Sequence, residues 1–374
     1  MGRSKIYIIA GEASGDLHGA NLMKALLNES KSLDFRFWGG DRMEELGGKP
    51  VKHIRDLAFM GFIEVVMNLR TIAKNLRFCK TDISEFKPDV LVLIDYPGFN
   101  LRIAEWAKSQ GIRVAYYVSP QVWAWKESRV KKIKQCVDQM FVILPFEKDF
   151  YKKHNFSVEY VGHPLLDAID NYRKENIDKS TFLQEINPEG KPIIAVLPGS
   201  RKQEISVKLP IMLEALKEYT NYCVVVAGAP SLDASFYTPF LPKGAKIVQG
   251  RTYDLLSLAE FGIVTSGTAT LETALLGIPE VVCYKGSSIS YQIAKRLIKI
   301  KFISLVNLIM DREVVTELIQ HECNPQRIKE EIEKIKVGGA NRETMLNDYK
   351  ILKEILGDGG ASAKVARSLL KTIQ

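Results

Sequence analysis

Short apolar runs alternate with stretches of helical periodicity along most of the chain. In the first half, the apolar run at 6–10 ends in a polar loop, and residues 17–27 follow with a helical pattern. The strands predicted in this half are 6–10, 35–38, 90–94, 114–118, 140–144 and 158–161. Continuous apolar strands that alternate with helices indicate a parallel sheet covered on both faces.

The same rhythm restarts after a polar segment at 167–191, which we interpret as a linker. The strands predicted beyond it are 193–197, 223–227, 246–248, 261–264 and 280–284, and the pattern is helical from 311 onward. We therefore expect an α/β protein with two doubly wound, Rossmann-like domains at 1–168 and 190–345. Helices at 346–374 are expected to pack back on the first domain or on a partner subunit. Ligands of such folds bind outside the carboxyl ends of the strands, so we expect a central cleft there.

Composition narrows the class of protein. The 374 residues are 46% hydrophobic and 26% charged, which excludes a disordered chain, a collagen and a small disulfide scaffold. The five cysteines are odd in number and none are spaced as CxxC, so a reducing compartment is expected. No apolar run approaches the roughly 20 residues of a membrane span, and the N-terminal run is too short for a signal peptide. The net charge of +8 favours an anionic partner: a nucleic acid, a phosphorylated small molecule or a membrane surface.

The turn Gly199-Ser200-Arg201 is a candidate phosphate site. It follows a predicted strand and precedes a helical stretch, so small residues would let the backbone approach a ligand beside free helix N–H groups. Arg201 adds a guanidinium whose geometry suits phosphate. The alternative is an ordinary strand–helix turn with a solvated arginine.

The segment Ser266-Gly267-Thr268-Ala269-Thr270-Leu271-Glu272 is a second candidate. Ser266, Gly267, Thr268 and Thr270 offer N–H and hydroxyl donors to a diphosphate, and Glu272, about one helical turn on, can accept hydrogen bonds from ribose hydroxyls. The alternative is a helix N-cap, because Ser or Thr followed by Glu resembles a capping box. Both interpretations can hold together.

Asp95 is the candidate general base. It ends the most hydrophobic predicted strand, 90–94, so its carboxylate would face the cleft and could take a proton from an attacking hydroxyl. The alternative is an N-cap or turn former before the helix near Asn100.

Several common motifs are missing from the sequence. The loop at 11–16, GEASGD, lacks the GxGxxG spacing of dinucleotide sites, and there is no GxxxxGK[ST], GxSxG or HExxH. There is also no D-x-D pair to hold a sugar nucleotide through a metal. The five histidines are far apart in sequence, so we assign none to a metal, and we expect neither a metal nor a cofactor.

Three basic stretches account for the positive charge. In the first, apolar residues recur at helical spacing among basic ones; the expected membrane-contact residues are Phe62, Val66, Leu69, Arg70, Ile72, Leu76 and Arg77. The second follows Trp123 and Trp125, and the third runs from Lys285 to Lys301. Basic amphipathic helices suit an anionic membrane surface, whereas each one alone can equally be a core helix with a solvated face. No RNA-binding motif is visible, so no nucleic-acid partner is expected.

Taken in order, these segments resemble lipid-A-disaccharide synthase nearly end to end. The segments that carry the resemblance are GEASGD, IDYPGFN, YYVSPQVWAW, ILPFEKDFY, VGHP, LPGSRKQEI, SGTATLE, AKRLIK and SLVNLIMDREVVTELIQHEC. The resemblance implies a glycosyltransferase of the two-domain GT-B architecture, on the cytoplasmic face of the inner membrane as a peripheral protein. It also implies a homodimer with exchanged C-terminal segments.

The implied reaction transfers 2,3-diacylglucosamine from UDP-2,3-diacylglucosamine to the 6-hydroxyl of 2,3-diacylglucosamine 1-phosphate. The product is the β-1′,6-linked lipid A disaccharide 1-phosphate with UDP, and the anomeric carbon inverts. In this resemblance Asp95 is the base, Arg201 and Gly267-Thr268 hold the diphosphate, with Arg296 as a further cation, and Glu272 holds the ribose. Asn307 would lie beside the nucleotide, and Ser14 would face the acceptor.

The sequence also leaves two other functions open. One is another UDP-sugar enzyme of the same architecture, either a glycosyltransferase acting on polyprenyl-linked substrates or a UDP-sugar epimerase. The other is a non-catalytic UDP- or RNA-binding protein, which would keep the phosphate loops but need no base.

Overall fold

A computed structural model describes residues 3–47, 50–57, 69–125, 127–174, 179–287, 291 and 300–373. It divides into two compact units, Met1–Asp167 with Asp358–Gln374, and Ala168–Gly357. The elements of the first unit are β1 (Ser4–Ala10), α1 (Ala13–Glu29), β2 (Leu33–Gly39), α2 (Asp41–Glu44), β3 (Lys52–His53), η1 (Ile54–Asp56), α4 (Leu69–Phe86), β4 (Val90–Ile94), α5 (Pro97–Ser109), β5 (Val114–Tyr117), α6 (Val122–Trp125), α7 (Arg129–Cys136), β6 (Gln139–Val142), α8 (Pro145–Lys153), β7 (Glu159–Tyr160) and α18 (Ala361–Ile373).

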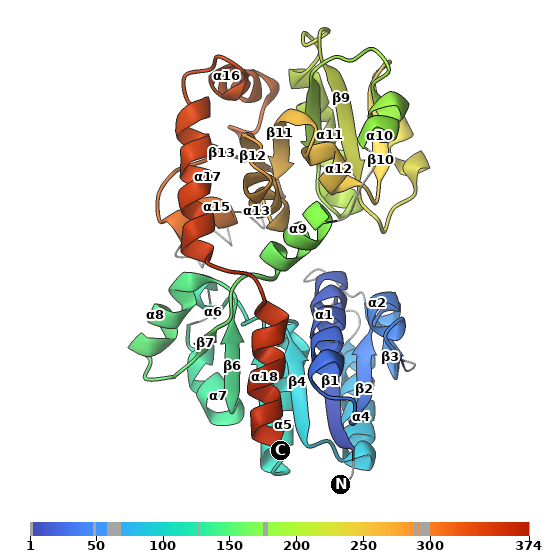
Figure 1. The fold of residues 1–374 in the computed structure, drawn as a ribbon, viewed down its shortest axis with the longest axis vertical. Coiled ribbons are helices and arrows are strands. Elements are labelled where there is room, and N and C mark those ends of the chain that lie inside the picture. Colours follow the sequence, from blue (N-terminus) through green and yellow to red (C-terminus); the bar gives the residue numbers. More distant parts are fainter. Residues whose placement is uncertain are drawn as a thin grey trace. The chain divides into compact units, whose positions relative to one another are not determined.

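The first unit is built on a seven-stranded parallel sheet (Figure 1). The strand order is β3-β2-β1-β4-β5-β6-β7, and Ile9 of β1 pairs with Trp38 on one side and with Leu93 on the other. β1 therefore lies inside the sheet: β2 and β3 are added on one side of it, and β4 to β7 are added on the other. In such sheets the loops diverge where the strand order reverses, which leaves room for a ligand at the carboxyl ends of β1 and β4.

Helices cover both faces of this sheet. Tyr7 and Ile9 of β1 belong to the core beneath α4, α5 and α7, whereas Ile6 and Ile8 belong to the core beneath α1 and α18. Successive residues of β1 point to opposite faces, so an uninterrupted apolar strand is required. Figure 1 shows α1 and α18 side by side, although they come from opposite ends of the chain.

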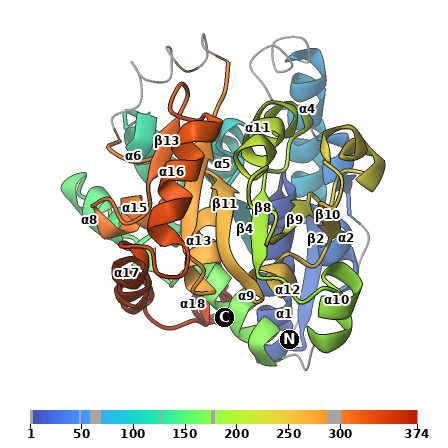
Figure 2. The same cartoon turned by 90° about the horizontal axis from the view of Figure 1, so that it is seen from above.

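The second unit repeats the plan with six parallel strands in the order β10-β9-β8-β11-β12-β13. Figure 2 shows α11 and α12 on opposite sides of β8 and β9. Its elements are α9 (Pro164–Lys174), which begins in the first unit, α10 (Lys179–Ile186), β8 (Ile193–Leu197), α11 (Lys202–Ala215), β9 (Cys223–Gly228), η2 (Ala234–Phe236), η3 (Thr238–Phe240), β10 (Lys246–Gln249), α12 (Thr252–Leu256), β11 (Ala259–Thr265), α13 (Thr268–Leu275), β12 (Glu280–Tyr284), α15 (Leu305–Met310), β13 (Glu317–Ile319), α16 (Pro325–Ile335) and α17 (Arg342–Leu356). The order reverses at β8, so its switch point lies between β8 and β11. The expected class of two doubly wound α/β units with a helical C-terminus is confirmed.

The expected linker at 167–191 is wrong. Its described part is largely helical, because Phe182 and Ile186 of α10 pack into the core of the second unit. The boundary between the units falls inside α9, after Asp167. The polar composition of the segment reflects the exposed faces of two helices.

The C-terminal segment that returns to the first unit begins later than the expected position 346. That position lies inside α17, which stays in the second unit and buries Tyr349, Leu352 and Leu356. Only Asp358–Gln374 joins the first unit. Asp167 caps the returning helix: its carboxylate accepts hydrogen bonds from Gly360 N and, at 3.0 Å, from Ala361 N.

No helix within the described ranges is both long and apolar enough to cross a bilayer.

A buried carboxyl at the start of β12 allows a stability test. Both carboxyl oxygens of Glu280 are buried without a hydrogen-bond partner among the described residues, and burial raises the pKa of Glu280 well above its usual range. The folded protein holds this proton, whereas the unfolded chain loses it above about pH 4.3. Stability contributed by the neutral group is therefore lost as pH rises above that point.

We expect Glu280→Met to be more stable than the wild type, by a margin that widens between pH 5 and pH 8. The unfolding midpoint, followed by circular dichroism at each pH, measures it. Glu354→Met, on the exposed face of α17, is the matched control and should show a constant margin. A pH-independent margin for Glu280→Met would contradict the assignment of a buried neutral carboxyl.

Candidate functional site

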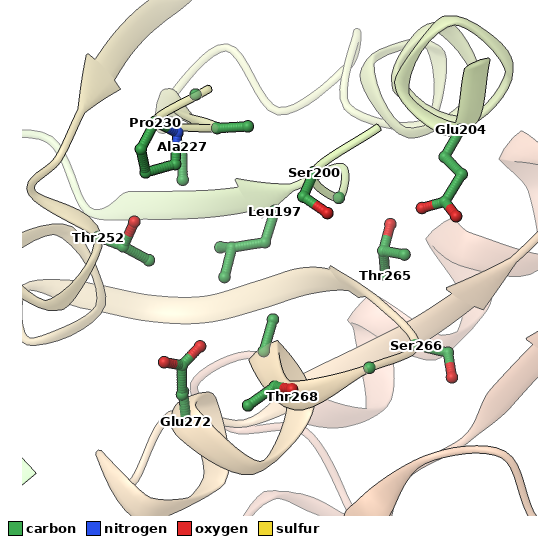
Figure 3. A pocket seen from close by; sticks show the side chains of 15 residues that line it. Leu197, Ser200, Glu204, Ala227, Pro230, Thr252, Thr265, Ser266, Thr268 and Glu272 are labelled. Atoms are coloured by element: carbon green, nitrogen blue, oxygen red, sulfur yellow. The ribbon is translucent and has the colours of Figure 1, made fainter. Parts of the chain in front are cut away.

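A pocket of about 280 Å³ lies at the switch point of the second sheet (Figure 3). It is formed by the loops after β8, β9 and β11 and by the first turns of the following helices. Its lining residues are Leu197, Gly199, Ser200, Glu204, Ala227, Gly228, Ala229, Pro230, Thr252, Thr265, Ser266, Gly267, Thr268, Ala269 and Glu272. The Gly199 turn thus lines the same pocket as the Gly267 turn and Glu272, which follow it by 68 and 73 positions in the sequence.

Both glycines have backbone conformations that other residues rarely adopt. Gly199 has a φ of +111°, and a Cβ there would lie 3.1 Å from Glu204 Oε2. Gly267, the N-cap of α13, has a φ of +149° and open space around it. The backbone can therefore approach a ligand closely at both turns, where the first N–H groups of α11 and α13 lack helical acceptors. This arrangement suits an anion.

Glu272 lies at the opposite end of the pocket from Glu204 (Figure 3). Tyr253 donates a hydrogen bond of 2.8 Å to Glu272 Oε1, which fixes the carboxyl group. Burial raises the pKa of Glu272, and the hydrogen bond from Tyr253 opposes that rise. Its second oxygen can accept hydrogen bonds from vicinal hydroxyls of a ligand.

Thr265 and Glu204 are among the lining residues that were not expected from the sequence. Thr265 ends β11, and its buried hydroxyl has no hydrogen-bond partner among the described residues. Glu204, one turn into α11, lines the pocket beside Ser200. In the sequence, Thr265 resembles any β-branched strand residue, and Glu204 resembles any charged residue on a helix surface. Neither pattern indicates a position in a binding pocket.

The other described residues that were expected at the nucleotide do not line the pocket. Arg201 is the N-cap residue of α11, is largely exposed, and lies 3.3 Å from Glu204 Oε1. Thr270 is buried and donates its hydroxyl to Gly267 O at 2.8 Å, so it stabilises the start of α13. Arg296 lies outside the described residues.

Asn307 is a structural residue. It is fully buried, donates to Val315 O and Glu317 Oε1, and accepts from Val314 N and Val315 N. All of its hydrogen-bonding groups are used in holding this loop, so it has no donor left for a ligand. Its expected position beside the nucleotide stays a prediction.

Asp95 lies at the switch point of the first sheet, directly after β4. Asp95 and Tyr96 have φ values of +43° and +50°, and Val118, at the end of the neighbouring strand β5, has +62°. The left-handed region disfavours residues with a side chain, and a β-branched one above all. Such strain persists where surrounding contacts impose it, often at functional sites.

Hydrogen bonds hold the strained turn in place. The Asp95 carbonyl accepts from Tyr116 Oη at 2.5 Å and from Asn100 Nδ2 at 2.7 Å, and Asp95 N donates to Tyr117 O. Burial, and next the charge of Glu12, raises the pKa of Asp95 to about 6. A carboxyl with this pKa is ionised at neutral pH yet basic enough to accept a proton from a reacting hydroxyl.

The loop after β1 lies beside this turn. A Cβ on Gly11 would lie 2.4 Å from the Tyr96 ring, so glycine is required for the contact. Ser14 is exposed in the first turn of α1. Asp16 is buried and accepts hydrogen bonds from Gly40 N, Arg42 N and Met43 N, so it anchors the start of α2. Glu12, which the sequence did not single out, is the acidic neighbour of Asp95.

The expected membrane-contact residues fall only partly within the described chain. Phe62 and Val66 lie outside it, and Leu69 is the first residue of α4, with no side chain described. Arg70 and Arg77 are exposed on α4, whereas Ile72 and Leu76 are half-buried, with Leu76 packed against the core. One side of α4 is therefore a core face and the other a basic face.

The described residues contain one group of potential metal ligands, Asp41, Glu44 and His53. Arg55 Nη2 lies 2.9 Å from Asp41 Oδ1, and Arg55 also donates to His53 Nδ1. The guanidinium compensates the negative charge of Asp41, so the group functions as a surface ion pair.

The chain is similar to known proteins over nearly its whole length. The family model of lipid-A-disaccharide synthetase matches residues 6–359. The lipid-A-disaccharide synthase of Syntrophus aciditrophicus is 39% identical over 384 residues, covering 100% of this chain and 99% of that protein. The enzyme of that name from Coxiella burnetii is 36% identical over 372 residues, covering 98% of each.

Solved structures share the fold at low identity. The glycotransferase of kitacinnamycin matches with a TM-score of 0.70 at 13% identity over 100% of both chains. The UDP-GlcNAc 2-epimerase of Neisseria meningitidis, bound to UDP-GlcNAc, matches with 0.66 at 14% identity over 98% of this chain and 100% of that one. The match of family model and relatives over nearly the whole chain shows that this protein belongs to the lipid-A-disaccharide synthase family and is a glycosyltransferase of lipid A biosynthesis.

Proposed function

We propose that the protein transfers 2,3-diacylglucosamine from UDP to the 6-hydroxyl of 2,3-diacylglucosamine 1-phosphate, with inversion at the anomeric carbon. The pocket of the second unit binds UDP. The observation that carries the proposal is that two glycine turns and Glu272 line this one pocket, in a chain of this family. The diphosphate fits the two turns, and the ribose hydroxyls fit Glu272.

In the proposed step, Asp95 takes the proton of the acceptor 6-hydroxyl while its oxygen attacks the anomeric carbon. The bond to the diphosphate breaks on the opposite face, and UDP leaves with the electron pair. Hydrogen bonds at the starts of α11 and α13 stabilise the growing negative charge, and Arg201 adds a cation from the N-cap of α11.

Both substrates carry acyl chains, and each CH₂ group costs about 0.8 kcal/mol to keep in water. We therefore propose that the enzyme works at a membrane surface as a peripheral protein, and the family resemblance implies the cytoplasmic face of the inner membrane. We propose that the basic side of α4, with Arg70 and Arg77, faces anionic lipid headgroups. Each arginine near such a surface contributes roughly 1 kcal/mol to the free energy of membrane binding. A homodimer remains part of the proposal on the strength of the family alone.

The direct test is to incubate the purified protein in detergent with UDP-2,3-diacylglucosamine and the monosaccharide 1-phosphate. Disaccharide and UDP should appear together, and both should require the acceptor. A UDP-sugar epimerase, by contrast, would act without acceptor or lipid. Formation of an isomerised UDP-sugar in place of a disaccharide would overturn the proposal.

Asp95→Asn removes the base but keeps the size of the side chain. We expect the rate of transfer to fall by about 10²- to 10⁴-fold, while the Kd for UDP, measured by calorimetry, stays within about twofold. Wild-type turnover in this variant would exclude Asp95 as the base.

The pH dependence of kcat/KM should report the ionisation of Asp95. Activity is expected to rise with pH through about 6, because only the ionised carboxylate can accept the proton. The charge of Glu12 raises the pKa of Asp95, so Glu12→Gln should move this acid limb to lower pH. Glu29→Gln, at the far end of α1, is the control and should leave it in place. A limb that stays or moves upward in Glu12→Gln would contradict the assignment.

Glu272 can be tested with a paired ligand. Wild-type protein should bind UDP about tenfold more tightly than 2′-deoxy-UDP, because the carboxylate accepts from the 2′-hydroxyl. In Glu272→Ala the two ligands should bind equally, both more weakly than UDP binds the wild type. Tyr253→Phe, which only loosens the carboxyl, should show an intermediate preference. A preference for UDP that survives in Glu272→Ala would remove the ribose assignment.

A further inference from the structure

A lysine ammonium is buried behind the first glycine turn of the pocket. Lys208, in α11, is only 2% exposed. Its Nζ lies 3.5 Å from Glu204 Oε2, and a Cβ on Gly199 would lie 3.7 Å from that same Nζ. Carboxylate and ammonium thus both point at the Gly199 turn. Burial lowers the pKa of Lys208, and the neighbouring Glu204 carboxylate opposes this.

The side chains that the structure describes around the pocket have the wrong charge for a diphosphate. Its fifteen lining residues, all within the described chain, include two carboxylates, Glu204 and Glu272, and no lysine or arginine. Figure 3 places Glu204 at the end of the pocket that also holds Ser200, Thr265 and Ser266, which is the end we propose for the diphosphate. The Glu204 side chain is 36% exposed, so solvent screens its charge only in part, and an uncompensated Glu204 would repel a phosphate oxygen beside it.

Two cations pair with Glu204, and they differ in environment. Arg201 lies on its outer side with 59% of its side chain exposed, so solvent and salt screen that pair. Lys208 lies on the inner side and is shielded from solvent. Other titratable groups that face Lys208 are the buried thiols of Cys283, in β12, and Cys323, in the segment after β13. Glu204 is therefore the carboxylate that this ammonium compensates.

We propose that Lys208 is a positioning residue for the donor diphosphate, acting through Glu204. Its ammonium neutralises and holds the Glu204 carboxylate, so that the Gly199 turn can accept the diphosphate beside it. This inference rests on the proposed binding of UDP in this pocket. Lys208 does not line the pocket, so it acts across the wall without touching the ligand.

The proposal is tested with UDP and uridine as probes, in wild type, Lys208→Met, Glu204→Gln and the double variant. Lys208→Met leaves Glu204 uncompensated, so its Kd for UDP should rise 10- to 100-fold. Glu204→Gln should bind UDP at least as tightly as the wild type, because it removes the repulsion. In the double variant, UDP affinity should return to within about threefold of Glu204→Gln. Uridine, followed by NMR titration, lacks the diphosphate and should bind all four proteins equally.

The possible failures are separable. If wild-type protein does not bind UDP, the proposed function fails. If the wild type binds UDP but Lys208→Met binds it equally well, the inference fails alone. A double variant as weak as Lys208→Met, or a parallel loss of uridine, would assign Lys208 a direct or purely structural role and overturn the proposal. Should Lys208→Met not fold, Glu204→Gln decides by itself: weaker UDP binding than wild type rejects the repulsion on which the argument rests.

Discussion

Burial of both faces of two parallel sheets is the constraint from which the functional geometry follows. β4 and β8 are buried along their whole length, so their side chains can only be apolar. For these two strands, polar side chains and unpaired backbone groups are then found in the loops at the strand ends. Where the strand order reverses, between β1 and β4 and between β8 and β11, these loops diverge and expose the starts of the following helices. Asp95 lies at the first of these points, and the pocket lies at the second.

The turn at Asp95 illustrates how a fold can hold an unfavourable backbone in a useful place. Left-handed residues other than glycine cost of order 1–3 kcal/mol each, and this corner contains Asp95, Tyr96 and Val118. Hydrogen bonds from Tyr116 and Asn100 to the Asp95 carbonyl, together with the stack of Tyr96 on Phe99, stabilise the arrangement. The carboxyl group is thereby kept in a poorly solvated position, which raises its pKa towards the range useful for a base.

The binding of anions that we propose for the pocket of the second unit is indirect. The walls of this pocket supply backbone N–H groups and hydroxyls, whereas its ionisable side chains are acidic. Cations stand behind or beside these groups: Lys208 and Arg201 flank Glu204. A shielded ammonium beneath a glycine turn adds positive potential without occupying the volume that the ligand needs. The surface of the pocket thus supplies hydrogen bonds, and the positive charge of Lys208 lies behind that surface.

The sequence by itself determined the two doubly wound units, because apolar runs that end in glycine turns have few other folded solutions. It also predicted the turns at Gly199 and Gly267 and the position of Glu272, since strand end, glycine and helix start are local features. The tertiary structure alone decided what these residues meet. The polar segment at 167–191 was predicted as a linker but contains helical residues of α9 and α10. Composition does not show which face of a helix packs against a core. The side chain of Asn307 is bonded to Val315 and Glu317. The Gly199 turn is surrounded by Glu204, Thr265 and Lys208, and Glu12 lies near Asp95. Burial and hydrogen-bond partners depend on distances between segments remote in sequence, and those distances exist only once the sheets have assembled.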